Sequence, residues 1–281
     1  MVNWAVKIEE LTKVYRDFWR RKSIPALTDL NLSIECGEVF GLLGPNGSGK
    51  TTTIKLMLGI LFPTSGRSWL LGYPSNDLKI KSKIGFLPEE SYLYKFLNAE
   101  EILDFYGRLF YITKKERKYR IDKLIHQVGL TSYRKRPLGQ YSKGMLRRIG
   151  LAQAIINDPE LIILDEPTSG LDPVGSREIK DLIIEFKKQG KTVVLCTHLL
   201  ADVQDICDRI AILDKGILQI VGTVKDLLSK KDVIEFIVRN LSEDNIPAVE
   251  SFIKSKNGDV LSVSHPFSTL EELFINIIKR R

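Results

Sequence analysis

Residues 44–52 read GPNGSGKTT, which satisfies the spacing G-x-x-x-x-G-K-[ST]. Glycines at Gly44, Gly47 and Gly49 allow the backbone to curl, so that successive N–H groups converge on phosphate oxygens. The run VFGLL precedes the motif and a helix-like segment follows it, which is the context that a phosphate-binding loop requires. The expected phosphate contacts are Gly44, Pro45, Asn46, Gly47, Ser48, Gly49, Lys50, Thr51 and Thr52.

Three side chains at the end of this loop have distinct predicted roles in binding a nucleotide such as ATP. Lys50 is expected to reach the β- and γ-phosphates, where its ammonium group neutralises charge. The hydroxyl of Thr51 is a predicted ligand of Mg²⁺, and that of Thr52 a predicted donor to the α-phosphate. The alternative is a glycine-rich turn with no ligand.

Two acids and a histidine follow later strand-like runs. LIILDE (161–166) ends in Asp165 and Glu166, and adjacent buried carboxylates are costly unless a cation or a reaction uses them. We expect Asp165 to ligate Mg²⁺ directly or through water, and Glu166 to polarise an attacking water. His198 follows TVVLCT and should reach the same sheet edge, to contact the γ-phosphate or the water. Alternatively, Asp165 caps a turn, Glu166 is a solvated acid and His198 is structural.

The elements that must position these residues alternate between strand and helix, which indicates α/β architecture. Buried parallel strands are expected at 39–43, 161–165 and 192–196, because both of their faces are apolar. Helix-start signals occur at Asn98 with Glu101, at Ser142 and at Asp172 before Pro173. The predicted helices follow Asn98, span about 114–128, run from Ser142 to about Asn157, and run from Asp172 to Gly190.

These patterns define three predicted regions. A nucleotide-binding core comprises 1–87 and 159–225, and it includes a hairpin at 209–221. Residues 88–158 form a helical insert. A small appended α+β domain at 226–281 contains predicted strands at 233–239 and 260–264 and a closing amphipathic helix beginning at Leu270.

Composition limits the other possibilities. The chain has 281 residues, of which 43% are hydrophobic, and its apolar runs are too short to span a membrane. No secretion signal is recognisable, so we expect a cytosolic location. The net charge of +7 permits nucleic-acid binding, but basic runs are more often solvated surface. The three cysteines, Cys36, Cys196 and Cys207, are expected to be reduced packing residues.

The motifs GPNGSGKTT, YSKGM, LDEPTSGLDP and TH, in this order, resemble those of the ATP-binding subunit of an ABC transporter, over about residues 6–225. The resemblance implies a P-loop NTPase fold with a RecA-like parallel sheet and an antiparallel β subdomain. It also implies hydrolysis of ATP with Mg²⁺, with Glu166 as base, His198 as positioner and Lys50 steadying charge. Transport would proceed through separate membrane subunits, with this chain peripheral to the cytoplasmic face of the membrane.

In that family the segment corresponding to YSKGM closes over ATP held by a second subunit. The resemblance therefore implies that Ser142, Lys143, Gly144 and Met145 contact the partner's nucleotide, together with Asp172 of SGLDP. The physics is consistent, because a serine hydroxyl, a free amide and a helix N-terminus form an anion site. Lys143 and Met145 depart from the usual glycine and glutamine, and the role of Lys143 stays open. The second subunit is an identical copy or a similar chain.

Two further matches follow from the resemblance, at Tyr15 and Glu89. Tyr15 stands where the family stacks an aromatic ring on adenine, although Phe18 and Trp19 are close in sequence. Glu89 occupies the place of the family's glutamine, where a carboxylate can ligate Mg²⁺ or orient water.

The expected contact with a membrane permease is a groove whose exposed aromatic residues would be Tyr92, Tyr94 and Phe96, which could instead be core residues. The C-terminal STLEELF resembles subunits of exporters; the rival interpretation is an ABC-fold ATPase acting on nucleic acid or ribosomes.

Overall fold

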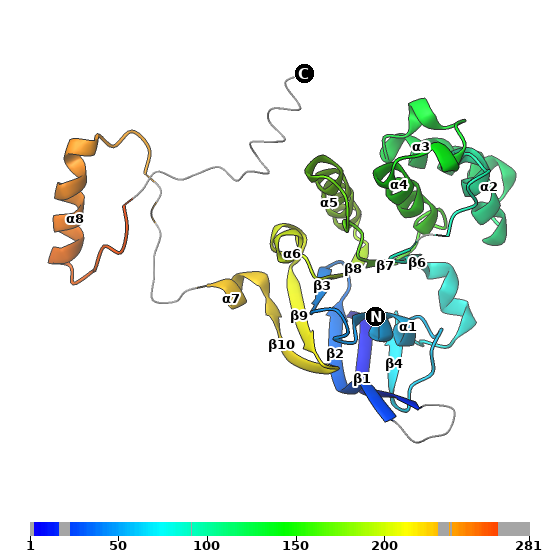
Figure 1. Ribbon diagram of the computed structural model, residues 1–281, viewed down its shortest axis with the longest axis horizontal. Helices are drawn as coiled ribbons and strands as arrows, with labels where there is room; N and C mark the ends of the chain where they lie inside the picture. Colours follow the sequence, from blue (N-terminus) through cyan, green and yellow to red (C-terminus); the bar gives the residue numbers. More distant parts are fainter. Residues whose placement is uncertain (1–2, 17–22, 91, 230–235, 237, 264–281) are drawn as a thin grey trace. The chain divides into compact units, whose positions relative to one another are not determined.

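The computed structural model describes residues 3–16, 23–90, 92–229, 236 and 238–263 (Figure 1). The chain forms two compact units, Met1–Leu227 and Leu228–Arg281. The motifs GPNGSGKTT, YSKGM, LDEPTSGLDP and TH lie in the first unit, whereas STLEELF lies outside the described residues.

A six-stranded sheet with the order β10-β9-β3-β8-β7-β6 forms the centre of the first unit. Its strands are β3 (Val39–Leu43), β6 (Ile84–Leu87), β7 (Leu161–Asp165), β8 (Thr192–Thr197), β9 (Arg209–Asp214) and β10 (Ile217–Thr223). All neighbours pair in parallel except β9 and β10, which form an antiparallel hairpin. The predicted buried strands and hairpin are confirmed, as is the α/β fold with a parallel sheet.

Side chains of the central strands alternate between two hydrophobic clusters, one on each face of the sheet. In β7, Ile162 and Leu164 belong to a cluster shared with the helices of the insert, whereas Leu161 and Ile163 belong to a cluster shared with the second sheet and α1. Because both faces are covered, the strands are apolar at every position and carry their polar residues only at their ends. The parallel strands therefore deliver those polar ends to one edge.

The second sheet is antiparallel, with the order β2-β1-β4-β5. Its strands are β1 (Trp4–Arg16), β2 (Ser23–Glu35), β4 (Ser65–Leu70) and β5 (Tyr73–Pro74). The helix α1 (Lys50–Met57) lies between β3 and β4 in the chain, and it contacts both β2 and β4. This sheet is the antiparallel β subdomain that the resemblance implied.

Three helices form the insert between β6 and β7, drawn in green in Figure 1: α2 (Ala99–Leu109), α3 (Lys114–Gln127) and α4 (Lys143–Ala154). Asn98 accepts from the amides of Glu100 and Glu101, and the Glu101 carboxylate accepts from the Asn98 amide, so the predicted capping box is present. Both α2 and α3 contact α4, and α4 also contacts β6. The insert therefore meets the sheet through the helix that begins at Ser142.

The remaining helices of this unit are α5 (Pro173–Lys188), α6 (Leu200–Ile206) and α7 (Val224–Leu228), with 3-10 turns at Leu78–Lys83, Thr131–Tyr133 and Leu138–Gln140. The Asp172 carboxylate accepts from the Gly175 amide at 2.8 Å and caps α5 as predicted. The predicted helix ends at Asn157 and Gly190 were too late, because α4 ends at Ala154 and α5 at Lys188.

The second unit differs from its prediction where the structure describes it. It contains a 3-10 turn, Glu243–Asn245, and α8 (Ile246–Ser255), which were not predicted. Residues 260–263 are not a strand, so the prediction of a strand at 260–264 was wrong. Leu261 is 76% exposed and Val263 53%, so the apolar residues of this segment do not form a buried face. Most of the predicted strand 233–239, and the closing helix, lie outside the described residues. The predicted domain boundaries stay a prediction.

Among the described residues, no helix combines the length and the apolar character that crossing a membrane requires.

Candidate functional site

The loop 44–49 connects β3 to α1 and presents the start of that helix to a cavity of about 500 Å³. Gly49 is the N-cap of α1, with φ of 107°, and it provides no side-chain cap. An added Cβ there would lie 2.7 Å from the Ala26 carbonyl oxygen, so only glycine fits. The first turn also has no acidic residue. The helix N-terminus therefore keeps its N–H groups and partial positive charge for an anion.

Lys50 is held inside this loop and is only 6% exposed. Its ammonium group donates to the carbonyls of Gly44, at 2.6 Å, and Pro45, at 3.2 Å. Within the described part of the chain, the buried hydroxyl oxygen of Ser48 has no hydrogen-bond partner. A buried cation and a buried, unpartnered hydroxyl lining one cavity fit a phosphate group, which would accept hydrogen bonds from both.

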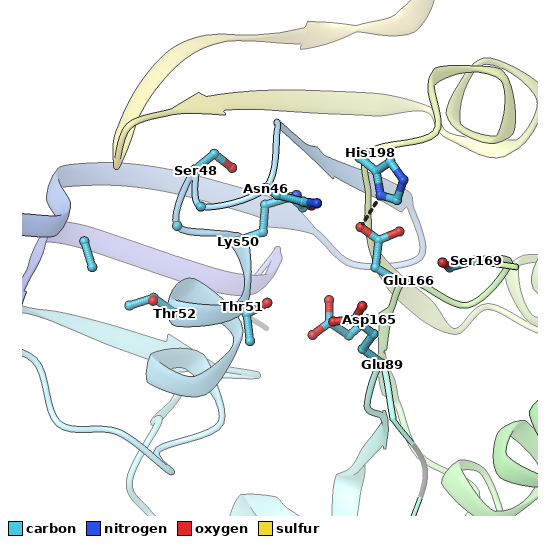
Figure 2. Close-up of a pocket in the computed structure, with 13 residues that line it drawn as sticks. Asn46, Ser48, Lys50, Thr51, Thr52, Glu89, Asp165, Glu166, Ser169 and His198 are labelled. Atoms are coloured by element: carbon cyan, nitrogen blue, oxygen red, sulfur yellow. Dashed lines mark hydrogen bonds and ion pairs between the residues drawn. The ribbon is translucent and has the colours of Figure 1, made fainter.

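Opposite the loop, the cavity is lined by Asp165, at the end of β7, by Glu166 and by Glu89. Figure 2 shows Glu166 between the His198 ring and the carboxylates of Asp165 and Glu89. Burial, followed by the charges of Glu89 and Glu166, raises the pKa of Asp165 to about 6, although Lys50 and Arg147 oppose the shift. This concentration of negative charge favours a bound cation.

The carboxylate of Glu166 is 6% exposed and has both oxygens engaged. Oε1 lies 2.8 Å from Nδ1 of His198, and Oε2 accepts from the Thr197 hydroxyl at 3.2 Å. Its backbone has φ of 48°, a left-handed conformation that non-glycine residues adopt at a cost. The side chain is thus fixed at the sheet edge while its backbone is strained, a combination common at functional sites.

The residues predicted to hold Mg²⁺ line the same cavity: Thr51, Asp165 and Glu89. One hydroxyl and two carboxylates are hard oxygen donors, which suit this ion. No group of three or more His, Cys, Asp or Glu side chains able to hold a metal occurs among the described residues. One hydroxyl and two carboxylates fit a metal that is held by few protein ligands together with substrate phosphates.

Most of the predicted phosphate contacts line the cavity, namely Asn46, Gly47, Ser48, Gly49, Lys50, Thr51 and Thr52. Gly44 and Pro45 do not line it, but their carbonyls hold Lys50. Tyr15 does not line it either; this tyrosine is 41% exposed, with the Lys13 ammonium 5.3 Å from its ring centre. Phe18 and Trp19, the competitors of Tyr15, lie outside the described residues.

The segment YSKGM starts α4 and does not line the cavity of its own chain. The Ser142 hydroxyl oxygen accepts from the Met145 amide at 3.2 Å, so its O–H remains able to donate. Ser142 and Lys143 are exposed, whereas Met145 is 9% exposed and packs in the hydrophobic core. The predicted contact of Met145 with the partner's nucleotide stays a prediction.

The Lys143 side chain extends toward the loop that follows Glu166. A Cβ added to Gly170 would lie 2.1 Å from the Lys143 ammonium nitrogen, so the two groups are adjacent. Asp172, two residues further on, uses its carboxylate to cap α5. Lys143 and Asp172, two of the five residues predicted to act in trans, therefore lie in a single region of the surface formed by two separate segments.

Three residues of the site were not predicted. Ala26 of β2 and Ser169 line the cavity. Arg147, in α4, is 7% exposed and donates to the main-chain carbonyls of Pro88, Glu89, Asp165 and Glu166. Ser169 lies three residues after Glu166, so proximity in sequence could have indicated it. Ala26 and Arg147 come from distant segments, and no local pattern marks them.

Comparisons with known proteins agree with this geometry. The family profile described as "ABC transporter" matches residues 27–169. An uncharacterised ABC transporter ATP-binding protein of Synechocystis sp. is 41% identical, with 99% of this chain and 85% of that protein aligned. The linearmycin resistance ATP-binding protein LnrL of Bacillus subtilis is 38% identical over 79% of this chain and 73% of its own length.

Solved structures with the same fold include the ATP-binding cassette MJ0796, in a dimeric post-hydrolysis state bound to ADP and Pi. Its TM-score is 0.71 at 29% identity, covering 78% of this chain and 98% of that one. CbiO1 of Clostridium perfringens, part of the ABC transporter complex cbiONQ, gives a TM-score of 0.73 at 28% identity, covering 90% and 100%.

Proposed function

Because this chain belongs to the ABC transporter family and is one of its ATP-binding, ATP-hydrolysing subunits, we propose that two copies close on two ATP molecules. Each ATP would lie between the phosphate loop of one copy and the Ser142 helix of the other. Closure and hydrolysis would then drive export through separate membrane subunits. The partner is an identical chain in this proposal.

The observation that carries the proposal is the placement of the start of α4. Ser142 and Lys143 are exposed and donor-rich, yet neither lines the cavity that holds Lys50 and Glu166. A serine O–H, an ammonium group and a helix N-terminus without acidic residues form an anion site. A second copy that faces this surface would supply the phosphate, and the dimeric neighbour bound to ADP and Pi supports such an assembly.

Within each site, Glu166 is the proposed general base that accepts a proton from the attacking water. His198 holds the Glu166 carboxylate through its Nδ1 and is exposed enough to contact the γ-phosphate as well. The Lys50 ammonium group donates hydrogen bonds to the carbonyls of Gly44 and Pro45 and lines the cavity. We propose that it balances the negative charge that develops during phosphoryl transfer. Tyr15 remains the proposed adenine contact, although the structure leaves it outside the cavity.

Mg²⁺ would be held by Thr51 and Asp165, with Glu89 as a further carboxylate. When bound, the ion neutralises phosphate charge and orients the transferring group. Burial, followed by repulsion from Glu89 and Glu166, raises the pKa of Asp165, and the positive charge of the ion would offset that repulsion. The donors present therefore fit the ion that the family's chemistry requires.

The proposed membrane contact is the aromatic surface formed by Tyr92, Tyr94 and Phe96 beside Glu89. These side chains are 85%, 50% and 77% exposed, so they are not core residues. Tyr94 packs against Phe96, with 5.7 Å between ring centres, and against Phe105 of α2, at 6.0 Å. A cluster of exposed aromatic rings suits a protein partner. Such docking would place the chain peripherally on the cytoplasmic face of a membrane.

Two properties of relatives support the finer parts of this proposal. LnrL is named for linearmycin resistance, which is consistent with export. CbiO1 is described as part of a transporter complex, which is consistent with separate membrane subunits. Nucleic acid is not among the proposed partners.

The docking proposal is tested with the double variant Tyr94→Ala, Phe96→Ala, by measuring the fraction of the chain that sediments with membranes. We expect a loss of about tenfold, since buried aromatic anchors carry a large share of binding energy. Tyr119→Ala, which removes another exposed tyrosine of the insert, is the control. Equal membrane fractions for the double variant and the wild type would refute the docking surface.

A further inference from the structure

Arg147 extends from α4 into the protein interior and donates to five backbone carbonyls. A guanidinium group has five N–H donors. Here Nε donates to Pro167 at 3.0 Å, Nη1 to Pro88 at 2.7 Å and Glu89 at 2.8 Å, and Nη2 to Asp165 and Glu166, the latter at 2.6 Å. Every donor is therefore used, and every acceptor is a main-chain oxygen.

These carbonyls belong to two segments that are far apart in sequence, 88–89 and 165–167. The two segments carry the three carboxylates of the cavity, Glu89, Asp165 and Glu166. The Arg147 side chain thus contacts the main-chain carbonyl of each acidic residue and makes no hydrogen bond to their carboxylate oxygens. Burial of this cation is unfavourable and lowers the pKa of Arg147, whereas the charges of Asp165, Glu89 and Glu166 favour the charged form.

We infer that Arg147 is the positioning residue that locks the three carboxylates of the ATP site to α4. Glu166 needs such a restraint, because its left-handed backbone, with φ of 48°, is strained and its carboxylate must face the cavity. By holding the carbonyls of Asp165, Glu166 and Pro167 together, Arg147 keeps this turn in one conformation. The Glu89 segment is fixed to the same group.

The inference deepens the proposed function and rests on it in one respect. The helix that carries Arg147 begins at Ser142, the residue proposed to contact a second copy's phosphate. An α-helix rises about 1.5 Å per residue, so the five-residue step from Ser142 to Arg147 amounts to about 8 Å of rigid helix. Contact between Ser142 and the partner's nucleotide would then be transmitted along α4 to Arg147. Through this side chain it would affect the carboxylates in the ATP site of the chain that carries Ser142.

Two substitutions separate positioning from bulk packing. Arg147→Lys keeps a cation but has at most three donors, so it cannot bridge all five carbonyls. Arg147→Met keeps an unbranched chain and has no donors. The matched control is Arg117→Met, because Arg117 is 8% exposed in the same insert and its hydrogen bonds to Asp104 and the Ile112 carbonyl stay inside the insert.

The first measurement is amide hydrogen exchange of the nucleotide-free protein, in peptides containing 88–90 and 166–169. Arg147→Met is expected to raise exchange about tenfold or more in both peptides, because it frees both segments at once. Arg147→Lys is expected to give a smaller increase, and Arg117→Met none in either peptide. This readout requires neither turnover nor a dimer, so it tests the inference even if the paired ATP site fails.

The second measurement is ATP turnover alongside ATP affinity. Displacement of Glu166 by a fraction of an ångström should lower kcat about 10- to 100-fold in Arg147→Met and less in Arg147→Lys. The affinity for ATP should change less than about threefold, because Arg147 does not line the cavity. Unchanged exchange and kcat in Arg147→Lys and Arg147→Met, or equal losses in Arg117→Met, would overturn the inference. If Arg147→Met does not fold, Arg147→Lys decides alone.

Discussion

Nδ1 of His198 lies 2.8 Å from Oε1 of Glu166, which joins the end of β8 to the end of β7 at the edge of the sheet. Glu166 is almost fully buried, whereas the His198 side chain is 43% exposed. The histidine therefore forms the outer wall of the site and holds the proposed base from the solvent side. Thr197 holds the other oxygen of the same carboxylate.

Replacement of His198 by alanine should lower kcat by about 100-fold, because the Glu166 carboxylate loses an orienting partner and the phosphate a contact. The KM for ATP should change much less, since Lys50 and the phosphate loop are untouched. Steady-state kinetics of His198→Ala measures both. His126→Ala, at the end of α3, serves as the control. A kcat within twofold of wild type would contradict the proposed role of His198.

Gly144→Ala should separate folding from function at the start of α4. The added Cβ would meet only Leu171, at 3.9 Å, and the Ser142 hydroxyl, at 4.0 Å, so the chain has room for it. Alanine is favoured over glycine inside a helix by about 1 kcal/mol, which predicts an equal or higher melting temperature. Turnover should nevertheless fall at least tenfold, because a methyl group would crowd a phosphate approaching these amides.

Calorimetry and a phosphate-release assay on the same Gly144→Ala preparation check both parts of this prediction. A stabilised variant with wild-type turnover would mean that no ligand approaches the start of α4.

Asp165→Asn should stabilise the protein in the absence of Mg²⁺ and nucleotide, in a manner that depends on pH. The folded-state pKa of Asp165 is raised from 3.8 to about 6, so the folded protein holds this proton more tightly than the unfolded chain. The ionised carboxylate thus destabilises the fold increasingly as pH rises from about 4 to about 6, by at most about 3 kcal/mol above that window. Asparagine removes the charge.

Thermal unfolding of wild type and Asp165→Asn at pH 4 and pH 8 measures this effect. The melting temperature of the variant should exceed that of the wild type at pH 8, and the difference should be small at pH 4. Equal differences in melting temperature at pH 4 and pH 8 would show that the surroundings of Asp165 do not destabilise its ionised carboxylate. Added Mg²⁺ should narrow the difference at pH 8, because the ion compensates the carboxylates.

Some parts of the site could be predicted from sequence because local residues determine them. The phosphate loop requires backbone conformations that glycine supplies, and the caps at Asn98 and Asp172 need only neighbouring amides. The strands at 161–165 and 192–196 are apolar at each position because both sheet faces are covered. The polar residues at the ends of these strands therefore indicate where the site lies.

Other parts depend on tertiary structure and could not be predicted in this way. Arg147 resembles an ordinary helix cation in the sequence, and only the fold brings it to carbonyls 18 to 59 residues away. Met145 belongs to the segment YSKGM, for which contact with a partner is predicted, but its side chain on α4 packs in the core. The apolar alternation at 260–264 predicted a strand, although Leu261 and Val263 are exposed. Alternation indicates a strand only where a buried face exists.

The central claim is that ATP binds between two copies, with the Ser142 helix of each facing the other's phosphate loop. Size-exclusion chromatography of Glu166→Gln with saturating ATP and Mg²⁺ tests it most directly, because loss of the base should leave the closed dimer unable to hydrolyse its ATP. We predict a stable dimer that returns to monomer when Gly144→Ala is added. A Glu166→Gln protein that stays monomeric under these conditions would contradict the account.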